Sequence, residues 1–554
     1  MDSTEQSKGH DNAGFVHTQQ PPTYQLNQNV VLSVSSLEND HQHSMQKKLI
    51  TKSKAEKCSK LSGCQIFLLV SGLLSIILSV AMLAGCFWLI FNAIMQSQME
   101  LREGTDNFDM WKKTPFPMIL KLYIFNITNH EDFLNGAKPK LKECGPYIWR
   151  EYHEKKEIEF FPNNTVTYMQ QRWWIWDEER SGTYKLDDMV YAVNPIPLSA
   201  TWSVRYYPKY LVNPSLKNLN RQFNELGEKA VVKATVNDLV FEGFQDPILD
   251  WIQENVVATN GSFHWLLPLI NLPPGLSDYD RFGWFYMRNM SLGYDGIFNM
   301  MTGADDYHNI GIIDMWNYTK ETTFFEVPCN AVVGSAGEYF SPDLERDKLV
   351  FYSSDLCMSV KLEYQKDVDM DGLSAYRFWG SKNTFANGSL VPGNECYCVK
   401  GTCAPTGLLN AESCRMGSPA FISFPHYFNA DPFLLDQIEG LKPEEDKHAF
   451  IMDIMPEAGV PVNVEARMQI NMRVIPYPGT EPGQVKIDIL EKVPDIYLPM
   501  IWFEVTADVP EDMIDQLKVL QFIKSSPVMT ICFSVFLLLG LCSVAYVIYV
   551  VLRK

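Results

Sequence analysis

Two long stretches without a charged side chain constrain the fold of this chain more than any other feature of its sequence. The first covers residues 61–99, with an apolar centre at 66–91, and the second covers residues 525–552. A helix of about 20 apolar residues crosses a bilayer. A core helix rarely runs so far without a charge, and a cleaved signal peptide would begin nearer the N-terminus. We therefore predict two transmembrane helices, at 61–95 and 525–552.

The charges beside these stretches predict their orientation. Six lysines lie at 47–60, before the first stretch, and Arg553–Lys554 follow the second. Acidic side chains follow the first stretch instead: Glu100, Glu103, Asp106 and Asp109. Cationic flanks stay on the cytosolic side of a membrane. The prediction is a cytosolic tail at each end, 1–60 and 553–554, around an outer domain at 96–524 that faces the cell exterior or an organelle lumen.

Glycosylation and cysteine patterns agree with this topology. Six N-x-[ST] sequons lie in the outer domain and none lies in the tails. They are Asn126, Asn163, Asn260, Asn289, Asn317 and Asn387. Seven of the 12 cysteines are there too, six of them within 329–414, as in an oxidised disulfide framework. Because seven is odd, one thiol is expected to be free, and Cys144 is isolated from the others.

Short alternating runs predict β-strands in the outer domain, at 118–127, 165–176, 350–364, 470–475 and 485–489. Helix starts are predicted where Asn213 and Asp246 each precede a proline. The predicted class is α+β, with a mostly antiparallel sheet decorated by helices.

Side-chain exposure follows from the same patterns. After Pro214, apolar residues at helical spacing leave four charged side chains more exposed: Lys217, Arg221, Glu225 and Glu228. Trp173, Trp174 and Trp176 are expected to pack between strands rather than to grip a lipid.

One basic patch interrupts an acidic chain. Residues 61–552 carry 38 basic against 60 acidic side chains, whereas residues 203–233 carry six basic against two acidic ones. The six are Arg205, Lys209, Lys217, Arg221, Lys229 and Lys233. Such a patch is either a solvated helix face or a docking site for anionic ligands such as carboxylates, phospholipid headgroups or oxidised lipoproteins.

Neither a metal site nor a catalytic site is predicted. Cys396, Cys398, Cys403 and Cys414 lack the paired spacing of a zinc site. Residues 367–372 begin like a calcium loop but have no glutamate at its twelfth position, so a turn between strands is expected. Catalytic motifs such as G-x-S-x-G and H-E-x-x-H do not occur, and we predict neither an enzyme nor a cofactor. The net charge of −19 argues against a nucleic-acid partner.

Seven short motifs lie in order along the outer domain. They are Glu103-Gly-Thr105, Gly145-Pro-Tyr147, Phe241-Glu-Gly-Phe-Gln-Asp-Pro247, Phe351-Tyr-Ser-Ser-Asp-Leu-Cys357, Cys396-Tyr-Cys398, Phe424-Pro-His426 and Asp453-Ile-Met-Pro-Glu-Ala-Gly459. Their identity and order resemble the class B scavenger receptor family, the family of fatty acid translocase and a lysosomal integral membrane protein. The resemblance covers residues 100–552, and we expect an invertebrate member, with a tail at 1–60 longer than is usual.

The resemblance implies a β-barrel-like outer domain with a helical apex and an apolar tunnel that runs toward the membrane. Members bind lipids, lipoproteins or particles bearing anionic phospholipid at the apex, and mediate lipid uptake or endocytosis. The implied disulfides are Cys329–Cys396, Cys357–Cys414 and Cys398–Cys403. The apex falls on the basic patch at 203–233.

Two departures from the family pattern affect function and location. The lysine that contacts fatty acid in the family has no clean counterpart, and Lys229 is the nearest substitute. The short C-terminal tail lacks a dileucine-type signal, which favours the plasma membrane over an endosomal or lysosomal membrane.

Cys58 and Cys64, beside the first span, are candidate palmitoylation sites. Homo-oligomers remain an open option.

The main rival interpretation is a two-span trimeric ion channel with a cysteine-rich ectodomain. A pore needs polar or small side chains along one face of a span. The second span offers Ser534 and Ser543 among large apolar residues. The sequence therefore favours a lipid receptor.

Overall fold

The chain has two helices that are long and apolar enough to cross a membrane. The computed structural model describes residues 61–254, 279–507, 509–524 and 527–553. The two helices are Gly63–Met99 and Pro527–Arg553, and neither has a charged side chain before Arg553. The first comprises α2 (Gly63–Ala81), a π-helical turn η1 (Met82–Cys86) and α3 (Phe87–Met99), and the second is α13. They agree with the two predicted membrane spans.

The described chain divides into two compact units. The larger unit contains residues 77–537, and the smaller unit contains residues 61–76 together with residues 538–553. In the smaller unit, α2 and α13 pack together through Gly72 and Gly540. A Cβ atom on Gly72 would lie 3.0 Å from the carbonyl oxygen of Gly540. Small residues at such a crossing let two membrane helices approach closely.

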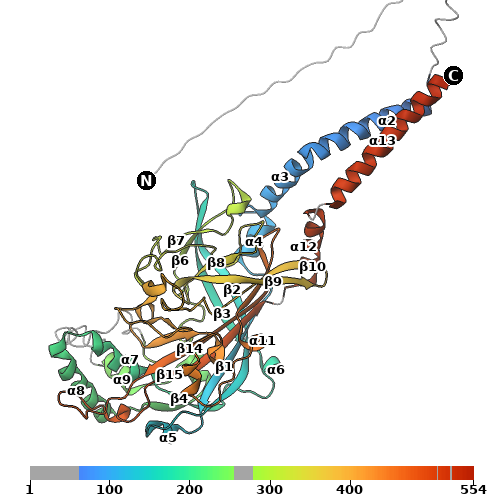
Figure 1. The fold of residues 1–554 in the computed structure, drawn as a ribbon. Coiled ribbons are helices and arrows are strands. Elements are labelled where there is room, and N and C mark those ends of the chain that lie inside the picture. The colour runs from blue at the N-terminus through green and yellow to red at the C-terminus, as the bar shows by residue number, and fades with distance from the viewer. Residues whose placement is uncertain (1–60, 255–278, 508, 525–526, 554) are drawn as a thin grey trace, which may run out of the picture. The chain divides into compact units, whose positions relative to one another are not determined.

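One antiparallel sheet dominates the larger unit (Figure 1). Its strands are, in spatial order, β7 (Ile313–Trp316), β6 (Ile297–Met301), β3 (Thr165–Trp176), β2 (Leu141–Phe161), β1 (Met118–Ile127), β15 (Ile496–Ala507), β14 (Val460–Val474), β13 (Ile451–Met455), β10 (Leu373–Trp379), β9 (Met358–Met370) and β8 (Lys348–Ser353). β12 (Ala420–Ser423) joins the sheet through β14 and pairs with β11 (Leu409–Asn410). A separate hairpin pairs β4 (Met189–Val193) with β5 (Val231–Thr235).

Ser335 brings the two edges of the large sheet together. It forms an antiparallel bridge to Ile312, beside β7, and a parallel bridge to Phe351 in β8. The sheet is therefore nearly closed on itself, which removes most of the unpaired edge that an open sheet would expose. The α+β class with an antiparallel sheet agrees with the prediction from the residue patterns, and the barrel-like form agrees with what the family resemblance implies.

Cross-strand pairs explain why the central strands associate. Tyr123 of β1 lies opposite Trp502 of β15, and their rings stack with centroids 3.8 Å apart. Gly145 lies where the β1–β2 register shifts, and a Cβ atom there would be 2.7 Å from the carbonyl oxygen of Leu122. The glycine of the Gly-Pro-Tyr motif is thus required by close backbone approach.

Three of the predicted strands match. Residues 118–127 and 165–176 coincide with β1 and β3, and 470–475 falls in β14 up to Val474. The expected turn at 367–372 is the β9–β10 hairpin, in which Asp371 and Gly372 both have positive φ, as a two-residue hairpin turn requires.

The single strand predicted at 350–364 is wrong. β8 ends at Ser353 and β9 begins at Met358. Between them, Cys357 has a φ of 59° and is bonded to Cys414, so a disulfide-linked turn interrupts the apolar run.

The strand predicted at 485–489 is also wrong. The backbone there forms one isolated bridge, between Lys486 and Pro478, and then a 3-10 turn, η10 (Asp488–Leu490). Ile487 is fully buried without sheet pairing, so its apolar character reflects core packing rather than a strand.

The predicted role of the three tryptophans is confirmed. Trp174 is buried, and its ring contacts those of Phe241 and Phe285. Trp173 stacks on Tyr152 of the neighbouring strand. Trp176 lies edge-on to Trp149, opposite it in β2. All three therefore pack between elements of the barrel.

Three helices lie together at one end of the barrel. Figure 1 shows α7 (Pro195–Ser203), α8 (Lys209–Leu226) and α9 (Pro247–Ile252) together at one end of the long strands. We call these three helices the apex. The described part of the larger unit also contains α4 (Asp106–Lys112), α5 (His130–Leu134), α6 (Glu178–Ser181), α10 (Phe433–Asp436), α11 (Glu445–His448) and α12 (Glu511–Lys524).

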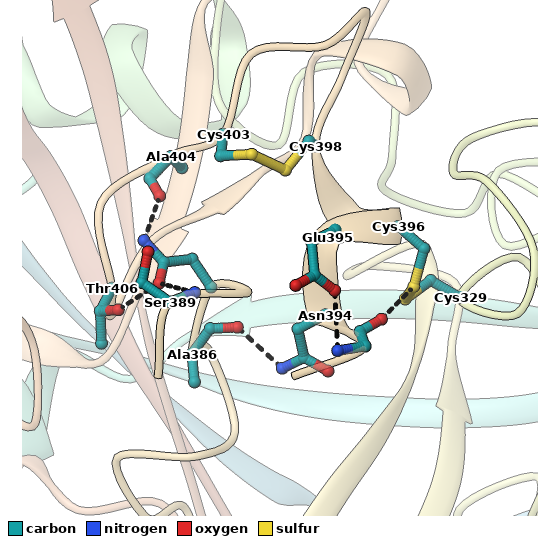
Figure 2. Close-up of a disulfide and its surroundings, with 12 residues drawn as sticks. Cys329, Ala386, Ser389, Asn394, Glu395, Cys396, Cys398, Cys403, Ala404 and Thr406 are labelled. Carbon is teal, nitrogen blue, oxygen red and sulfur yellow. Dashed lines mark hydrogen bonds between the residues drawn. A yellow bond between two sulfur atoms is a disulfide. The ribbon is translucent and has the colours of Figure 1, made fainter. Parts of the chain in front are cut away.

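Three disulfides cross-link the barrel: Cys329–Cys396, Cys357–Cys414 and Cys398–Cys403. They are the pairs that the family resemblance implies. Figure 2 shows how Cys396 and Cys398, at either side of Tyr397, turn to different partners. Cys144 carries a free thiol that is half-buried, and burial raises its pKa.

Candidate functional site

Side-chain caps fix the starts of two apex helices. Asn194 caps α7 by accepting a hydrogen bond from the backbone nitrogen of Ile196 at 3.0 Å. Asp246 caps α9 by accepting from the backbone nitrogens of Ile248 and Leu249, at 2.9 and 3.4 Å. The predicted helix start at Asp246 is confirmed, and its chemistry is that of an ordinary N-cap followed by proline.

The predicted start of α8 at Asn213 is wrong, because the helix begins at Lys209 and contains Pro214. Pro214 is the sixth residue of α8 and has no N–H group to donate to the carbonyl of Tyr210, so the helix forms with one hydrogen bond fewer in its second turn. Asn213 instead donates its side-chain amide to the carbonyl of Gly483 at 2.7 Å. Gly227, in the left-handed conformation, ends the helix.

Four of the predicted basic residues lie on or beside α8. Arg205 precedes the helix and places its guanidinium carbon 4.0 Å from the centre of the Trp202 ring. Lys209 is the first residue of α8 and is exposed. Lys217 and Arg221, four residues apart, share one exposed face.

The other two basic residues lie beyond the helix. Lys229 follows Gly227, and Lys233 belongs to β5, with its ammonium 5.5 Å from the centre of the Tyr191 ring. From Lys209 to Arg221 the helix axis alone advances about 18 Å, at 1.5 Å per residue. The six residues therefore form an extended basic surface rather than a single ligand-sized pocket.

Residues distant in sequence modify this surface. Lys400 lies over the ring of Tyr206, 3.1 Å from its centre. Asp488 accepts hydrogen bonds from Asn220 and Asn224 of α8, at 3.0 and 2.7 Å. Counting charges along one segment of sequence does not detect such neighbours.

Glu228 was predicted to be exposed, and this prediction is wrong. Its relative exposure is 5%, and its Oε1 accepts a hydrogen bond of 2.8 Å from Asn194 Nδ2. The same nitrogen donates to Asp246 Oδ2 at 2.7 Å. Burial and then the charge of Asp246 raise the pKa of Glu228 to about 7. Glu228 is therefore partly neutral near pH 7 and offsets less of the basic charge than the sequence suggests.

A cavity of about 620 Å³ lies beneath the apex. Its walls come from the apex helices and from the barrel strands. The lining includes Ile196, Ala200, Asn218, Leu219, Gln222 and Ile252 from the helices, and Leu120, Ile422, Met468, Ile470, Phe503 and Val505 from the strands. Ligand pockets commonly have volumes of roughly 300–1,000 Å³ and mainly apolar walls. The cavity corresponds to the apex end of the expected tunnel, and its extension toward the membrane stays a prediction.

Comparison with known proteins identifies relatives that align with most of this chain. Residues 69–551 match the model of the CD36 family. The chain is 34% identical over 429 residues to Protein peste of Drosophila melanogaster, covering 76% of this chain and 72% of that protein.

Two mammalian relatives have a similar sequence identity to this chain. Identity to Scavenger receptor class B member 1 of Rattus norvegicus is 31%, covering 78% of this chain and 79% of that protein. Identity to Lysosome membrane protein 2 of Homo sapiens is 30%, covering 73% and 79%. The resemblance seen in the motifs is thus confirmed over the spans and the barrel together. This two-span membrane protein belongs to the CD36 family, the family of the class B scavenger receptors.

Proposed function

We propose that this receptor captures lipids, lipoproteins or other particles with an anionic surface on α8, and holds a lipid in the cavity beneath that helix. One hydrogen bond carries the proposal: Arg221 Nη2 donates to Asn218 Oδ1 at 2.7 Å. Arg221 belongs to the exposed basic surface, whereas Asn218 lines the cavity. The basic surface and the cavity wall are therefore formed by adjoining faces of the same helix.

The basic surface and the cavity would contribute to the binding free energy in different ways. Exposed cations attract an anionic surface and speed its arrival, but salt screens them within about 8 Å at physiological ionic strength. Hydrocarbon in the cavity would gain about 0.8 kcal/mol for each buried CH2 group. In this mechanism, the basic surface selects and orients the particle, and burial of the acyl chain supplies most of the affinity.

The orientation and location of the receptor are part of the proposal. Both termini would be cytosolic and the barrel extracellular, at the plasma membrane, with an endosomal or lysosomal membrane as the alternative. The glycans would lie on the same side as the barrel. Of the two candidate palmitoylation sites, Cys64 is exposed at the start of α2, and Cys58 lies outside the described residues.

Charge reversal on the apex tests the proposed capture step. We expect Lys217→Glu, Arg221→Glu and Lys229→Glu together to reduce binding of phosphatidylserine-containing vesicles to cells that express the full chain. The deficit should shrink as salt is raised, because screening already weakens the wild-type attraction.

A matched variant controls for the change in net charge. Lys361→Glu, Lys366→Glu and Lys382→Glu reverse three exposed lysines outside the apex, and this variant should bind vesicles like the wild type. If the apex variant reaches the cell surface and binds as well as wild type at low salt, the basic residues form a solvated helix face and the proposed capture step is wrong.

A further inference from the structure

The hairpin that joins β2 to β3 ends in a tight three-residue loop. Phe161 and Thr165 are paired across the hairpin, so residues 162–164 form the loop. The backbone nitrogen of Asn164 donates to the carbonyl of Phe161 at 3.1 Å, and Asn164 has a φ of 61°. A turn with proline as its second residue, here Pro162, followed by a left-handed residue is a common three-residue hairpin loop. The backbone of the loop is therefore well defined.

Three side chains share one face of this loop. Paired residues of two strands project to the same face of a sheet, so the side chains of Phe161 and Thr165 are neighbours. Thr165 Oγ1 donates to Asn163 Oδ1 at 2.9 Å, which brings the Asn163 amide to that face too. The face therefore carries an aromatic ring, an asparagine and a threonine. We call Phe161, Asn163 and Thr165 the hairpin sequon.

The loop is tied to the segment where the first membrane helix meets the barrel. The backbone nitrogen of Thr302 donates to the carbonyl of Asn164 at 2.9 Å. The carbonyl of Thr302 in turn accepts a hydrogen bond of 2.9 Å from the backbone nitrogen of Leu101, just beyond the end of α3. Anything that stabilises the loop therefore also stabilises the attachment of α3 to the barrel.

The amide nitrogen of Asn163 is available for modification. Asn163 is exposed, and it begins the motif Asn163-Asn-Thr165, one of the six sequons. Its Oδ1 accepts the hydrogen bond from Thr165, whereas its Nδ2 forms no hydrogen bond within the part of the chain that the structure describes. A glycan on Nδ2 would therefore displace no hydrogen bond of the loop.

The ring of Phe161 is exposed on the same face. It is 37% exposed, and it belongs to none of the apolar clusters formed by the described residues. The preceding residue, Phe160, points the other way and packs on Phe108, with ring centroids 5.9 Å apart. The apolar surface of Phe161 thus stays in water unless a group attached to the loop covers it.

A second sequon with the same spacing has a different environment. Asn387 also follows a phenylalanine by two residues, Phe385. That ring is only 4% exposed, because it packs in the core. Asn387 Nδ2 is itself in use and donates to the carbonyl of Ala404 at 3.1 Å. The spacing alone therefore does not identify an exposed ring beside a sequon, and the structure selects Asn163.

We propose that Asn163 carries an N-glycan whose first N-acetylglucosamine packs on the ring of Phe161 and stabilises the hairpin. The inference rests on the outward orientation in the proposed function, which exposes the sequon where glycans are attached. Transfer from a lipid-diphosphate donor bonds C1 of the sugar to Nδ2, breaks the bond from C1 to the diphosphate oxygen, and releases one amide proton. The C–H groups of the sugar ring carry partial positive charge, which suits the electron-rich face of an aromatic ring.

Enzymatic trimming tests the contact without any substitution. The full chain is produced in cells that make only high-mannose glycans and is purified in detergent. Endoglycosidase H leaves one N-acetylglucosamine on each asparagine, whereas peptide-N-glycosidase F removes the whole glycan. Hydrogen exchange is then measured by mass spectrometry for peptides that cover residues 158–168. Exchange should be the same with the full glycan and with the single sugar, and about twofold to tenfold faster without it, the range for one aromatic packing contact.

Two substitutions form a double-mutant cycle, Phe161→Ala and Asn163→Gln. Asn163→Gln should speed exchange of the hairpin when Phe161 is present, and should have no effect in the Phe161→Ala background. Phe161→Tyr keeps an aromatic face and should behave like wild type. The control Ser291→Ala removes the sequon at Asn289, where Met287 replaces the aromatic residue, and it should leave exchange of the hairpin unchanged.

The outcomes separate this inference from the proposed orientation. If glycopeptide mass spectrometry finds Asn163 unmodified while other sequons are modified, the hairpin glycan is wrong and the orientation stands. If no sequon is modified, the outward orientation fails, and the inference fails with it. If the single-sugar and sugar-free proteins exchange alike, or if the two substitutions act independently, the glycan is solvated and does not pack on Phe161.

Discussion

Glu228 and Asp246 accept hydrogen bonds from one amide nitrogen, Asn194 Nδ2, at 2.8 and 2.7 Å. Asn194 caps α7, Asp246 caps α9, and Glu228 follows the end of α8, so the pair lies where the three apex helices meet. Glu228 Oε2 has no hydrogen-bond partner among the described residues. A proton on Glu228 would therefore remove the repulsion between the two carboxylates and satisfy that oxygen.

This arrangement predicts an apex that is more stable in acid. Burial, and next the charge of Asp246, raise the pKa of Glu228 from 4.5 to about 7, so its ionisation opposes folding. The penalty is absent below the unfolded pKa, grows as pH rises from about 4.5 to 7, and is then constant, at no more than about 3 kcal/mol. Glu228→Gln, which cannot ionise, should raise the melting temperature at about pH 8 and leave it unchanged at about pH 4.5.

The measurement is thermal unfolding of the full chain in detergent, for wild type and variant, across this pH range. Glu225→Gln, on the exposed face of α8, is the control. It should leave the melting temperature unchanged at both about pH 4.5 and about pH 8. A Glu228→Gln variant with the same pH dependence as wild type would show that the carboxylate pair is not strained at neutral pH.

Local patterns predicted those parts of the fold that local forces determine. The alternation in β1, the Asp246-Pro247 helix start and the Asp371-Gly372 turn each depend on a few adjacent residues, and each was predicted correctly. The start of α8 was missed because Pro214 is tolerated in its early turns. The break between β8 and β9 was missed because the turn there contains Cys357, whose disulfide partner Cys414 is distant in sequence and is not visible in the local alternation.

The residues of the candidate site were predicted less completely. The basic surface is local in sequence, so a charge count found it. Arg288 and Tyr294 lie in one segment and Arg415 lies far along the sequence, and the fold brings all three to the wall of the cavity. The burial of Glu228 likewise depends on Asn194 and Asp246, which belong to other elements.

The lengths of the disulfide loops predict unequal effects on folding. Cys357 and Cys414 are 57 residues apart, whereas Cys398 and Cys403 are 5 apart. Loop-closure entropy gives about 4 kcal/mol for the long loop and about 2 kcal/mol for the short one. Replacing both cysteines of the Cys357–Cys414 pair with alanine should therefore reduce surface delivery more than the same change at Cys398–Cys403. Equal or reversed losses, measured by surface biotinylation, would contradict this ranking.

The flanking charges predict where tags are accessible. An epitope added after Lys554 should stain only permeabilised cells, since Arg553–Lys554 follow the second span on its proposed cytosolic side. Enzymatic removal of N-glycans should increase gel mobility, because the sequons share the opposite side. Staining of the C-terminal tag on intact cells would contradict the proposed orientation.

Filling the cavity beneath the apex tests most directly whether it holds a lipid. Ile470→Trp places a larger side chain on the cavity wall. Extra volume in a space that other atoms already fill destabilises a protein by about 1–3 kcal/mol. Ile175→Trp is the matched control, because Ile175 is 52% exposed and does not line the cavity. The measurement is native mass spectrometry of the full chain, purified in mild detergent. Wild type and Ile175→Trp should retain a lipid, and folded Ile470→Trp should lose it. No lipid in wild type, or the same lipid load in all three proteins, would contradict lipid binding in the cavity.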